Sequence, residues 1–308
     1  MSGPVVVITG GVGGAKLVEG LTHAIPHEQL TAIVNTGDDF EHLGLPISPD
    51  IDTLLYTLSG RANASQGWGR EGESWSFMEV VRSLGGEDWF NLGDGDLALH
   101  VLRGAALRAG QPLSAIIRRF ALNWNLGLTI LPMSDDPVAT WIESDQGALP
   151  FQRYFVEHRC TPRVSAIRFV GAESASPAPG VIAAIEAAQT ILIAPSNPWL
   201  SVDPLLALPA LRVALERRNG PLVAVSPLVA GTAVKGPTAK LMQELGLPVN
   251  NASIAAHYGS LLDGLVIHES DDAPEGLAIA RTNTLMQTPQ DKLRVAQAAL
   301  DLARQCAG

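Results

Sequence analysis

The sequence is poor in cysteine, in basic residues and in long apolar runs. Its two cysteines, Cys160 and Cys306, lie far apart without metal-ligand spacing, which predicts reduced thiols in a cytoplasmic protein and no disulfide or zinc site. The chain has 21 basic residues and 31 acidic ones, and this excess of acidic residues argues against binding nucleic acid or an anionic membrane. Apolar windows such as residues 181–194 are interrupted by Glu186 and Gln189, and the N-terminus lacks the pattern of a secretory signal. We therefore expect no membrane span.

The remaining composition is that of a globular protein, with 46% hydrophobic and 17% charged residues. A chain of 308 residues is long enough for one large domain or two smaller ones. The net charge of −10 disfavours the binding of a phosphate-bearing substrate unless specific groups offset it. An acidic protein needs backbone dipoles, a few well-placed cations or a metal ion to hold such a substrate.

The strongest local pattern is VVVITGGVGGAKLVEGL at residues 5–21. A β-branched strand is followed by a glycine-dense turn, and a helix-compatible stretch begins at Ala15. Such a unit brings backbone N–H groups and a helix N-terminus to an anion. The turn matches neither the Walker loop nor the dinucleotide fingerprint, whose third glycine is replaced by Lys16. Taken alone, it supports a phosphate site and a plain tight turn equally. Its four glycines are Gly10, Gly11, Gly13 and Gly14.

Short strand-like runs alternate with helix-like stretches along the chain. This order predicts an α/β protein with a mainly parallel sheet that has helices on both faces. Residues 51–122 differ, and we expect them to form a smaller, mostly helical insertion beside a main domain of residues 1–50 and 123–308. The expected strands are 5–9, 31–35, 127–131, 164–170, 190–194, 222–226 and 264–268, and the clearest helices are 97–109, 112–122, 179–188, 204–217, 238–245 and 291–305.

Four aspartates cluster after the second expected strand. Asp38 and Asp39 follow the strand directly, and Asp50 and Asp52 lie at the start of a helix that Ser48 is placed to cap. Any one of them is explained by a turn or a helix N-terminus. Four within fifteen residues, at the carboxyl end of a strand, suit Mg²⁺, which takes one or two carboxylates and completes its shell with water and phosphate. The sequence therefore predicts a magnesium site there.

Other polar loops follow later strands or precede helices. The segment LGDGD at residues 92–96 precedes a helix with His100 and Arg103, and Asp96 is explained by a turn or cap alone. Loops after three other strands place serine, asparagine, aspartate and lysine at one edge of the sheet, as a nucleotide site requires. These loops are residues 131–138, 194–198 and 225–237.

The motifs in order resemble the 2-phospho-L-lactate transferase family of coenzyme F(420) biosynthesis over roughly the whole chain. They are GGVGGAKL (10–17), NTGDD (35–39), PDIDTLLYTL (49–58), GWG (67–69), LGDGD (92–96), LPMSDDPV (131–138), PSNP (195–198) and SPLVAGTAVKGP (226–237). The resemblance implies a Rossmann-like fold and Mg²⁺-dependent transfer from a GDP-linked donor to the ribityl hydroxyl of the deazaflavin Fo, with release of GMP. It implies a lactyl, enolpyruvyl or glyceryl donor acid, and a homodimer.

The resemblance also assigns residues. Asp38, Asp39, Asp50 and Asp52 match positions near metal and acceptor, with Asp52 and Asp50 the expected catalytic groups. The remaining expectations concern the two substrates. For the donor they are the four turn glycines, Ser196 and Asn197 at the diphosphate, and Ser226, Pro227, Gly231 and Lys235 towards the guanine or an anionic group; for the acceptor they are Asp52, Trp68, Asn91, Asp94 and His100.

Three positions depart from the family pattern. Gly95 stands where relatives carry arginine, Asn91 stands where some carry lysine, and Leu99 replaces a threonine. Two cations are therefore missing, which leaves the donor acid open. A nucleotide-sugar-binding regulator without turnover is the alternative, and a dinucleotide-dependent oxidoreductase is disfavoured by the missing third glycine.

Overall fold

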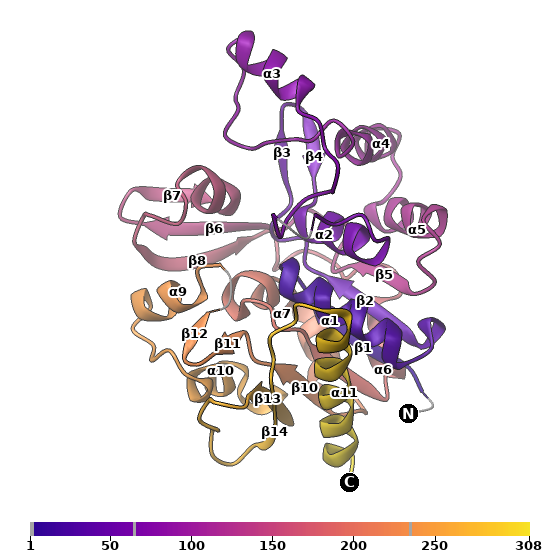
Figure 1. The fold of residues 1–308 in the computed structure, drawn as a ribbon, viewed down its shortest axis with the longest axis vertical. Helices are drawn as coiled ribbons and strands as arrows, with labels where there is room; N and C mark the ends of the chain where they lie inside the picture. Colours follow the sequence, from indigo (N-terminus) through magenta and orange to yellow (C-terminus); the bar gives the residue numbers. More distant parts are fainter. Residues whose placement is uncertain (1–2, 64–65, 234–235) are drawn as a thin grey trace.

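A seven-stranded parallel sheet forms the centre of the computed structural model, which describes residues 3–63, 66–233 and 236–308 (Figure 1). The strand order is β14-β13-β10-β9-β1-β2-β5, and every neighbouring pair is parallel. The predicted fold class is thus confirmed. The strands are β1 (Val5–Thr9), β2 (Leu30–Val34), β5 (Thr129–Pro132), β9 (Thr190–Ile193), β10 (Leu222–Val225), β13 (Gly264–His268) and β14 (Ala278–Thr282).

Helices cover both faces of this sheet, and alternate residues of each strand enter opposite cores. In β1, Val5 and Val7 pack into one core while Val6 and Ile8 pack into the other. The central strands are therefore buried on both sides and read as continuous apolar runs. The first core is covered by α1 (Gly11–Ala24), α2 (Pro49–Leu58), α4 (Leu97–Arg108), α5 (Leu113–Asn123) and α11 (Pro289–Cys306), and the second by α6 (Val181–Ala187), α7 (Asp203–Leu206), α8 (Pro209–Glu216), α9 (Thr238–Glu244) and α10 (Asn251–Tyr258).

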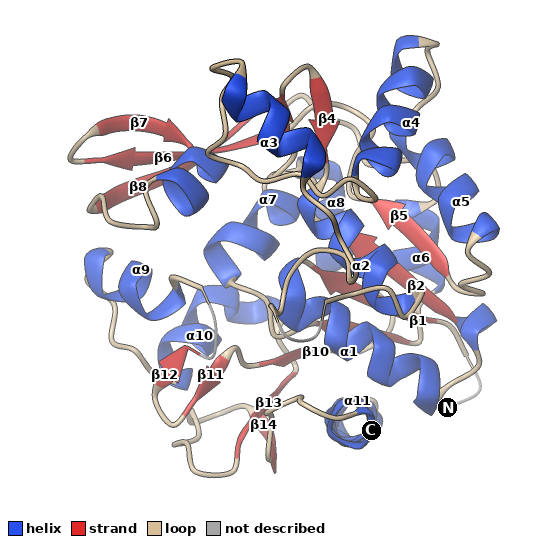
Figure 2. Ribbon diagram, turned by 45° about the horizontal axis from the view of Figure 1, so that its top comes forward, coloured by secondary structure: helices blue, strands red, loops and turns tan. Residues whose placement is uncertain are grey.

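Smaller elements extend from the sheet's carboxyl edge (Figure 2). A hairpin of β3 (Phe40–His42) and β4 (Leu45–Ile47) and the helix α3 (Ser76–Ser83) form the upper part of the molecule in Figure 1. An antiparallel sheet of β6 (Ala139–Ser144), β7 (Gly147–Pro150) and β8 (Val164–Val170) forms an arm. The remaining elements are β11 (Leu228–Val229), β12 (Thr232–Ala233), the π-helical turns η2 (Arg153–Glu157) and η3 (Pro198–Val202), and the 3₁₀ turns η1 (His27–Gln29) and η4 (Gly259–Leu261).

Several elements differ from the sequence-based expectation. The first helix begins at Gly11 instead of Ala15, so the glycines form its first turn. The expected helix over 204–217 is two helices, because Leu208 precedes Pro209 and is extended, as a residue before proline prefers. The expected strand 164–170 belongs to the antiparallel arm. The edge strand β14 was not predicted, since its partly exposed residues lack a long apolar run.

No single helix in the described ranges is long and apolar enough to cross a membrane. One bent pair, residues 198–206 with 209–216, meets the length and composition criteria jointly. Leu205, Leu211 and Leu215 of that pair are completely buried in the second core.

Candidate active site

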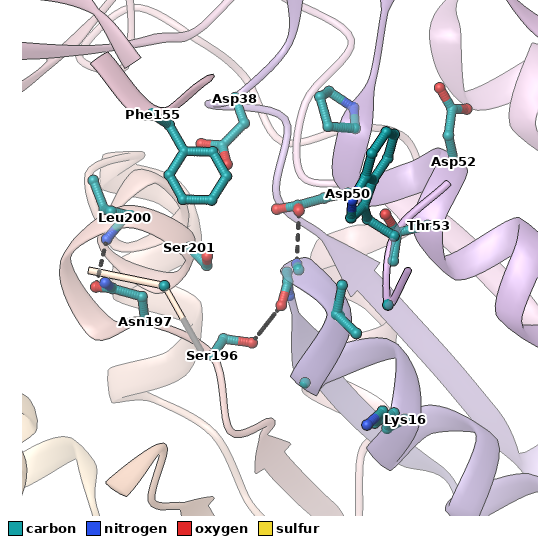
Figure 3. Close-up of a pocket in the computed structure, with 18 of the residues that line it drawn as sticks. Lys16, Asp38, Asp50, Asp52, Thr53, Phe155, Ser196, Asn197, Leu200 and Ser201 are labelled. Atoms are coloured by element: carbon teal, nitrogen blue, oxygen red, sulfur yellow. Dashed lines mark hydrogen bonds between the residues drawn. The ribbon is translucent and has the colours of Figure 1, made fainter. Parts of the chain in front are cut away.

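The order in which the chain adds strands to the sheet reverses between β1 and β9. From β1 the chain adds β2 and β5 on one side, whereas β9, β10, β13 and β14 extend the other side. Ligands of open α/β sheets bind outside the carboxyl ends of strands at such a point. A cavity of about 850 Å³ lies there, bounded by the segments that follow β1, β2, β9 and β10 and by the hairpin, α2, α4 and η2 (Figure 3).

The glycine turn and the segment after β9 form one wall of the cavity. The backbone N–H of Gly10 donates to Ser196 Oγ at 3.2 Å, and that hydroxyl donates to the carbonyl of Gly10 at 2.7 Å. A Cβ on Gly13 would lie 2.6 Å from the carbonyl oxygen of Pro195, and Gly11 has a φ of +66°. The approach of these two segments thus requires glycine. The first turn of α1 faces the cavity with N–H groups that have no partner within the helix.

Two further polar side chains lie near this turn. Asn197 accepts the backbone N–H groups of Trp199 and Leu200, while its buried Nδ2 makes no hydrogen bond. Lys16 of α1 also lines the cavity, and its Nζ donates to the carbonyl of Met286 at 2.7 Å. This end of the cavity therefore combines a helix N-terminus, an amide and a cation, which together suit a phosphate group.

Asp38 and Asp50 place negative charge at the same wall (Figure 3). Asp50 Oδ1 accepts the N–H of Gly11 at 2.6 Å, and its Oδ2 accepts Asn35 Nδ2 at 3.0 Å. Burial raises the pKa of Asp50 to about 6 even though both hydrogen bonds favour the charged form. Burial, followed by the charge of Asp50, raises the pKa of Asp38 well above its ordinary value. Asp38 Oδ1 has no hydrogen-bond partner.

Asp52 and Asp39 are differently placed. Asp52 lines the cavity, but both of its carboxylate oxygens accept hydrogen bonds from Arg103, whose side chain is 1% exposed. Its carboxylate points away from Asp50 in Figure 3. Asp39 accepts the Ser48 hydroxyl at 2.7 Å and lines a second cavity on the other side of the hairpin. The four predicted acidic residues thus divide into Asp38 with Asp50, and two residues with other partners.

The arrangement of these carboxylates decides whether the site can hold the expected Mg²⁺. No group of three or more His, Cys, Asp or Glu in the described part of the chain is arranged to hold a metal ion. Mg²⁺ needs only one or two protein carboxylates when a substrate phosphate supplies further oxygens. Asp38 Oδ1 is buried without a hydrogen-bond partner among the described residues, and Asp38 and Asp50 both line the cavity, so the donor set fits such an ion.

Only some of the residues expected near the guanine line the cavity. Ser226 and Pro227 line the cavity, and the Ser226 hydroxyl donates to Asn251 Oδ1 at 2.6 Å. Gly231 lies outside the lining, with its N–H donated to Asp271 Oδ1 at 3.0 Å. Lys235 lies outside the described residues.

Of the four residues expected at the acceptor apart from Asp52, three line the cavity. Trp68, half exposed, and Asn91 lie towards its mouth, and His100 of α4 is buried in its wall. Asp94 is not among the lining residues. Its carboxylate accepts the Ser74 hydroxyl and the N–H groups of Ser76 and Phe77, so it holds the start of α3.

An aromatic wall lies at this end of the cavity, and sequence reasoning missed its residues Phe151 and Phe155. Trp89 lines it from the insertion, and Phe151 and Phe155 line it from the arm. Arg153 joins the two sides, since its guanidinium lies 4.3 Å from the Trp89 ring centroid and 2.9 Å from Glu87. The available signal was the aromatic content of residues 151–155, which lacked any recognisable motif.

The missing arginine at position 95 has a structural counterpart. A Cβ on Gly95 would lie 2.4 Å from Nη1 of Arg70, which pairs with Glu73 at 3.1 Å. Arg70 thus brings a cation from another loop to the position from which a side chain at residue 95 would start.

The fold and cavity define a Rossmann-like α/β protein with a ligand site at the switch point of its sheet. The family model of the 2-phospho-L-lactate transferase CofD matches residues 5–305, and the chain belongs to this family. The predicted family resemblance is thus confirmed.

Curated relatives agree with this assignment, and a solved structure shares the fold. The chain is 41% identical to a phosphoenolpyruvate transferase of Streptomyces griseus and 35% identical to one of Mycolicibacterium smegmatis, covering 98% of each relative. These alignments cover 98% and 97% of this chain. A protein of the UPF0052 family from Bacillus halodurans has the same fold, with a TM-score of 0.64, 18% identity and coverage of 97% of this chain and 100% of that one.

Proposed function

We propose that the protein transfers a phospho-carboxylic-acid group from a GDP-linked donor to the ribityl hydroxyl of Fo in coenzyme F(420) biosynthesis, releasing GMP. The observation that carries the proposal is the single cavity that joins the glycine turn and its two carboxylates to the aromatic wall. One end has the features of a diphosphate site and the other suits a flat aromatic ring. Membership of the CofD family supports the same reaction.

The donor acid that we favour is enolpyruvate. Eight relatives at 35–41% identity carry the name phosphoenolpyruvate transferase. Lactyl and glyceryl donors remain the alternatives to be measured. We also propose that the protein acts as a homodimer, for which light scattering of the purified protein is the test.

In this reaction the residues of the protein position the two substrates and balance the charge on the phosphates. The first turn of α1, Ser196 and Asn197 orient the diphosphate so that its reacting phosphorus faces the acceptor hydroxyl. Asp38 and Asp50 would hold Mg²⁺, which would neutralise charge on the diphosphate and on the departing GMP. The pKa of about 6 that burial gives Asp50 applies to the metal-free site, so a carboxylate that does not ligate the ion accepts the hydroxyl proton as the new P–O bond forms.

A coupled assay tests the proposal. Purified protein is mixed with Fo, Mg²⁺ and each of the three GDP-linked donors prepared in situ, and products are identified by mass. We expect the dehydro product from the enolpyruvyl donor at the highest kcat/KM. A higher kcat/KM with another donor would correct the acid alone. Binding of a nucleotide sugar with no binding of Fo would instead favour the regulatory alternative.

A further inference from the structure

Helices α2 and α4 bring a second set of polar side chains to the acceptor end of the cavity. Asp52 and Tyr56 of α2 face Asp96 and His100 at the start of α4, and all four line the cavity. The Tyr56 hydroxyl donates to Asp96 Oδ1, and His100 Nε2 lies 3.2 Å from Asp96 Oδ2. None of the cavity's phosphate-binding features takes part in this set.

The two carboxylates of the set differ in their exposure and in their partners, since Asp52 pairs with an arginine whereas Asp96 contacts Tyr56 and His100. Arg103 occupies both oxygens of Asp52, whose side chain is 7% exposed. The side chain of Asp96 is 18% exposed and lines the cavity. Asp96 is therefore the carboxylate of this pair that a ligand reaches.

The charge state of Asp96 suits a hydrogen-bond acceptor. Burial opposes ionisation, but His100, then Tyr56 and Arg103, hold the pKa of Asp96 below its ordinary value. Burial and the charges of Asp52 and Asp96 raise the pKa of Tyr56, so its hydroxyl remains a donor. An ionised carboxylate beside Asp52 repels phosphate, whereas it attracts the O–H of an uncharged polyol.

Capping of α4 does not explain the place of Asp96. It stands at the N-cap position of α4, yet its side chain makes no capping hydrogen bond. Asp94, two residues earlier, carries the structural role by holding α3.

We propose that Asp96 accepts a hydrogen bond from a hydroxyl of the acceptor's polyol chain, with Tyr56 and His100 as positioning residues that orient its carboxylate. The inference rests on the proposed function, because it takes the acceptor to be a ring bearing a hydroxylated chain. It places the ring against the aromatic wall and the chain between that wall and the carboxylates of α2 and α4.

The test compares Asp96→Asn, Tyr56→Phe and their double variant with Glu71→Gln, a matched carboxylate-to-amide change at an exposed residue of the same region. Fluorescence titration measures the Kd of Fo and of the same deazaflavin ring carrying a methyl group instead of the ribityl chain. Calorimetry measures the Kd of GDP. The three ligands separate loss of the chain contact from loss of the fold.

We expect Asp96→Asn to weaken Fo binding about tenfold or more, because a hydrogen bond to a charged group is lost. Binding of GDP and of the methyl ligand should stay within about twofold of wild type, as should all three Kd values of Glu71→Gln. Tyr56→Phe should weaken Fo binding less, and should add nothing to Asp96→Asn, because it acts through the same carboxylate.

Four results would overturn all or part of the inference. Unchanged Fo binding in Asp96→Asn refutes the contact while leaving the proposed function intact. If Asp96→Asn weakens the binding of Fo and of the methyl ligand equally, Asp96 has a structural role. If the losses of Fo affinity in the double variant are additive, Tyr56 does not act through Asp96. Failure of the wild type to bind Fo, with GDP still bound, refutes the proposed acceptor and this inference with it.

Discussion

The two ends of the cavity are built in opposite ways. The end at the sheet consists of backbone and short side chains that follow β1, β2 and β9, where Gly13 leaves no room for a Cβ. The other end consists of long side chains from the insertion and the arm, held by contacts such as Arg153 with Trp89. An end built from backbone suits the diphosphate common to all candidate donors, and an end built from aromatic side chains suits a flat ring.

The largest expected effect is at the sheet end. Asp50→Asn should lower kcat about 10³-fold, because it removes one of the two carboxylates of the proposed Mg²⁺ site. The amide oxygen still accepts the Gly11 N–H, so we expect the fold to persist. Single-turnover transfer measures the effect, with the exposed Glu41→Gln as control. Activity within tenfold of wild type would exclude Asp50 from the reaction.

A second prediction contrasts a buried ion pair with an exposed one. Arg103→Met should destabilise the protein by about 3–5 kcal/mol, because it leaves Asp52 charged and buried without its partner. Arg212→Met, which breaks an exposed pair on α8, should cost less than about 1 kcal/mol. Urea unfolding measures both. Adding Asp52→Asn to Arg103→Met should restore part of the loss, and equal losses in the two single variants would contradict the contrast.

The third prediction concerns pH. A pKa of about 6 for Asp50, against an ordinary 3.8, corresponds to about 3 kcal/mol. Because the folded state binds the proton more tightly, metal-free stability should fall as pH rises from about 4 to about 6.

Magnesium should reverse this trend. The rise in melting temperature on adding Mg²⁺ should be larger at pH 8 than at pH 5, because a protonated Asp50 does not bind the ion. Asp50→Asn should reduce the pH dependence of that rise, and the part that remains should come from Asp38. Equal rises at both pH values would separate the ion from Asp50.

The smallest effect is expected at the side-chain end. Arg153→Gln should raise the Kd of Fo about threefold, because it loosens Trp89 and the aromatic wall. The Kd of GDP should not change. Arg168→Gln, another exposed arginine of the arm paired with Glu143, is the control. An equal change for both ligands would show that the two ends are not independent.

This division also explains what the sequence predicted. The parallel sheet and the position of the glycine turn were predictable, because buried strands and tight turns leave local patterns. Residues at strand ends such as Ser196 followed from the topology rule alone.

The side-chain end was not predictable in the same way. Whether Asp94 or Asp96 faces the cavity depends on where α3 lies, which no local pattern records. The partner of Asp52 is Arg103, 51 residues away, and α2 and α4 must first be packed together. Phe155 lies on a π-helical turn, for which the sequence has no simple signature.

The hydrogen bonds between Gly10 and Ser196 have a consequence for the order of folding. They join residues 186 positions apart, and β9 is the strand that completes the central pair with β1. Loop closure of this length is slow, and a chain growing at roughly 5–20 residues per second reaches β9 only after about 10–40 s of synthesis. β1 therefore lacks its neighbour β9 until that part of the chain has been made. A nascent fragment that ends before β9 cannot form the wall of the cavity in which Gly10 contacts Ser196.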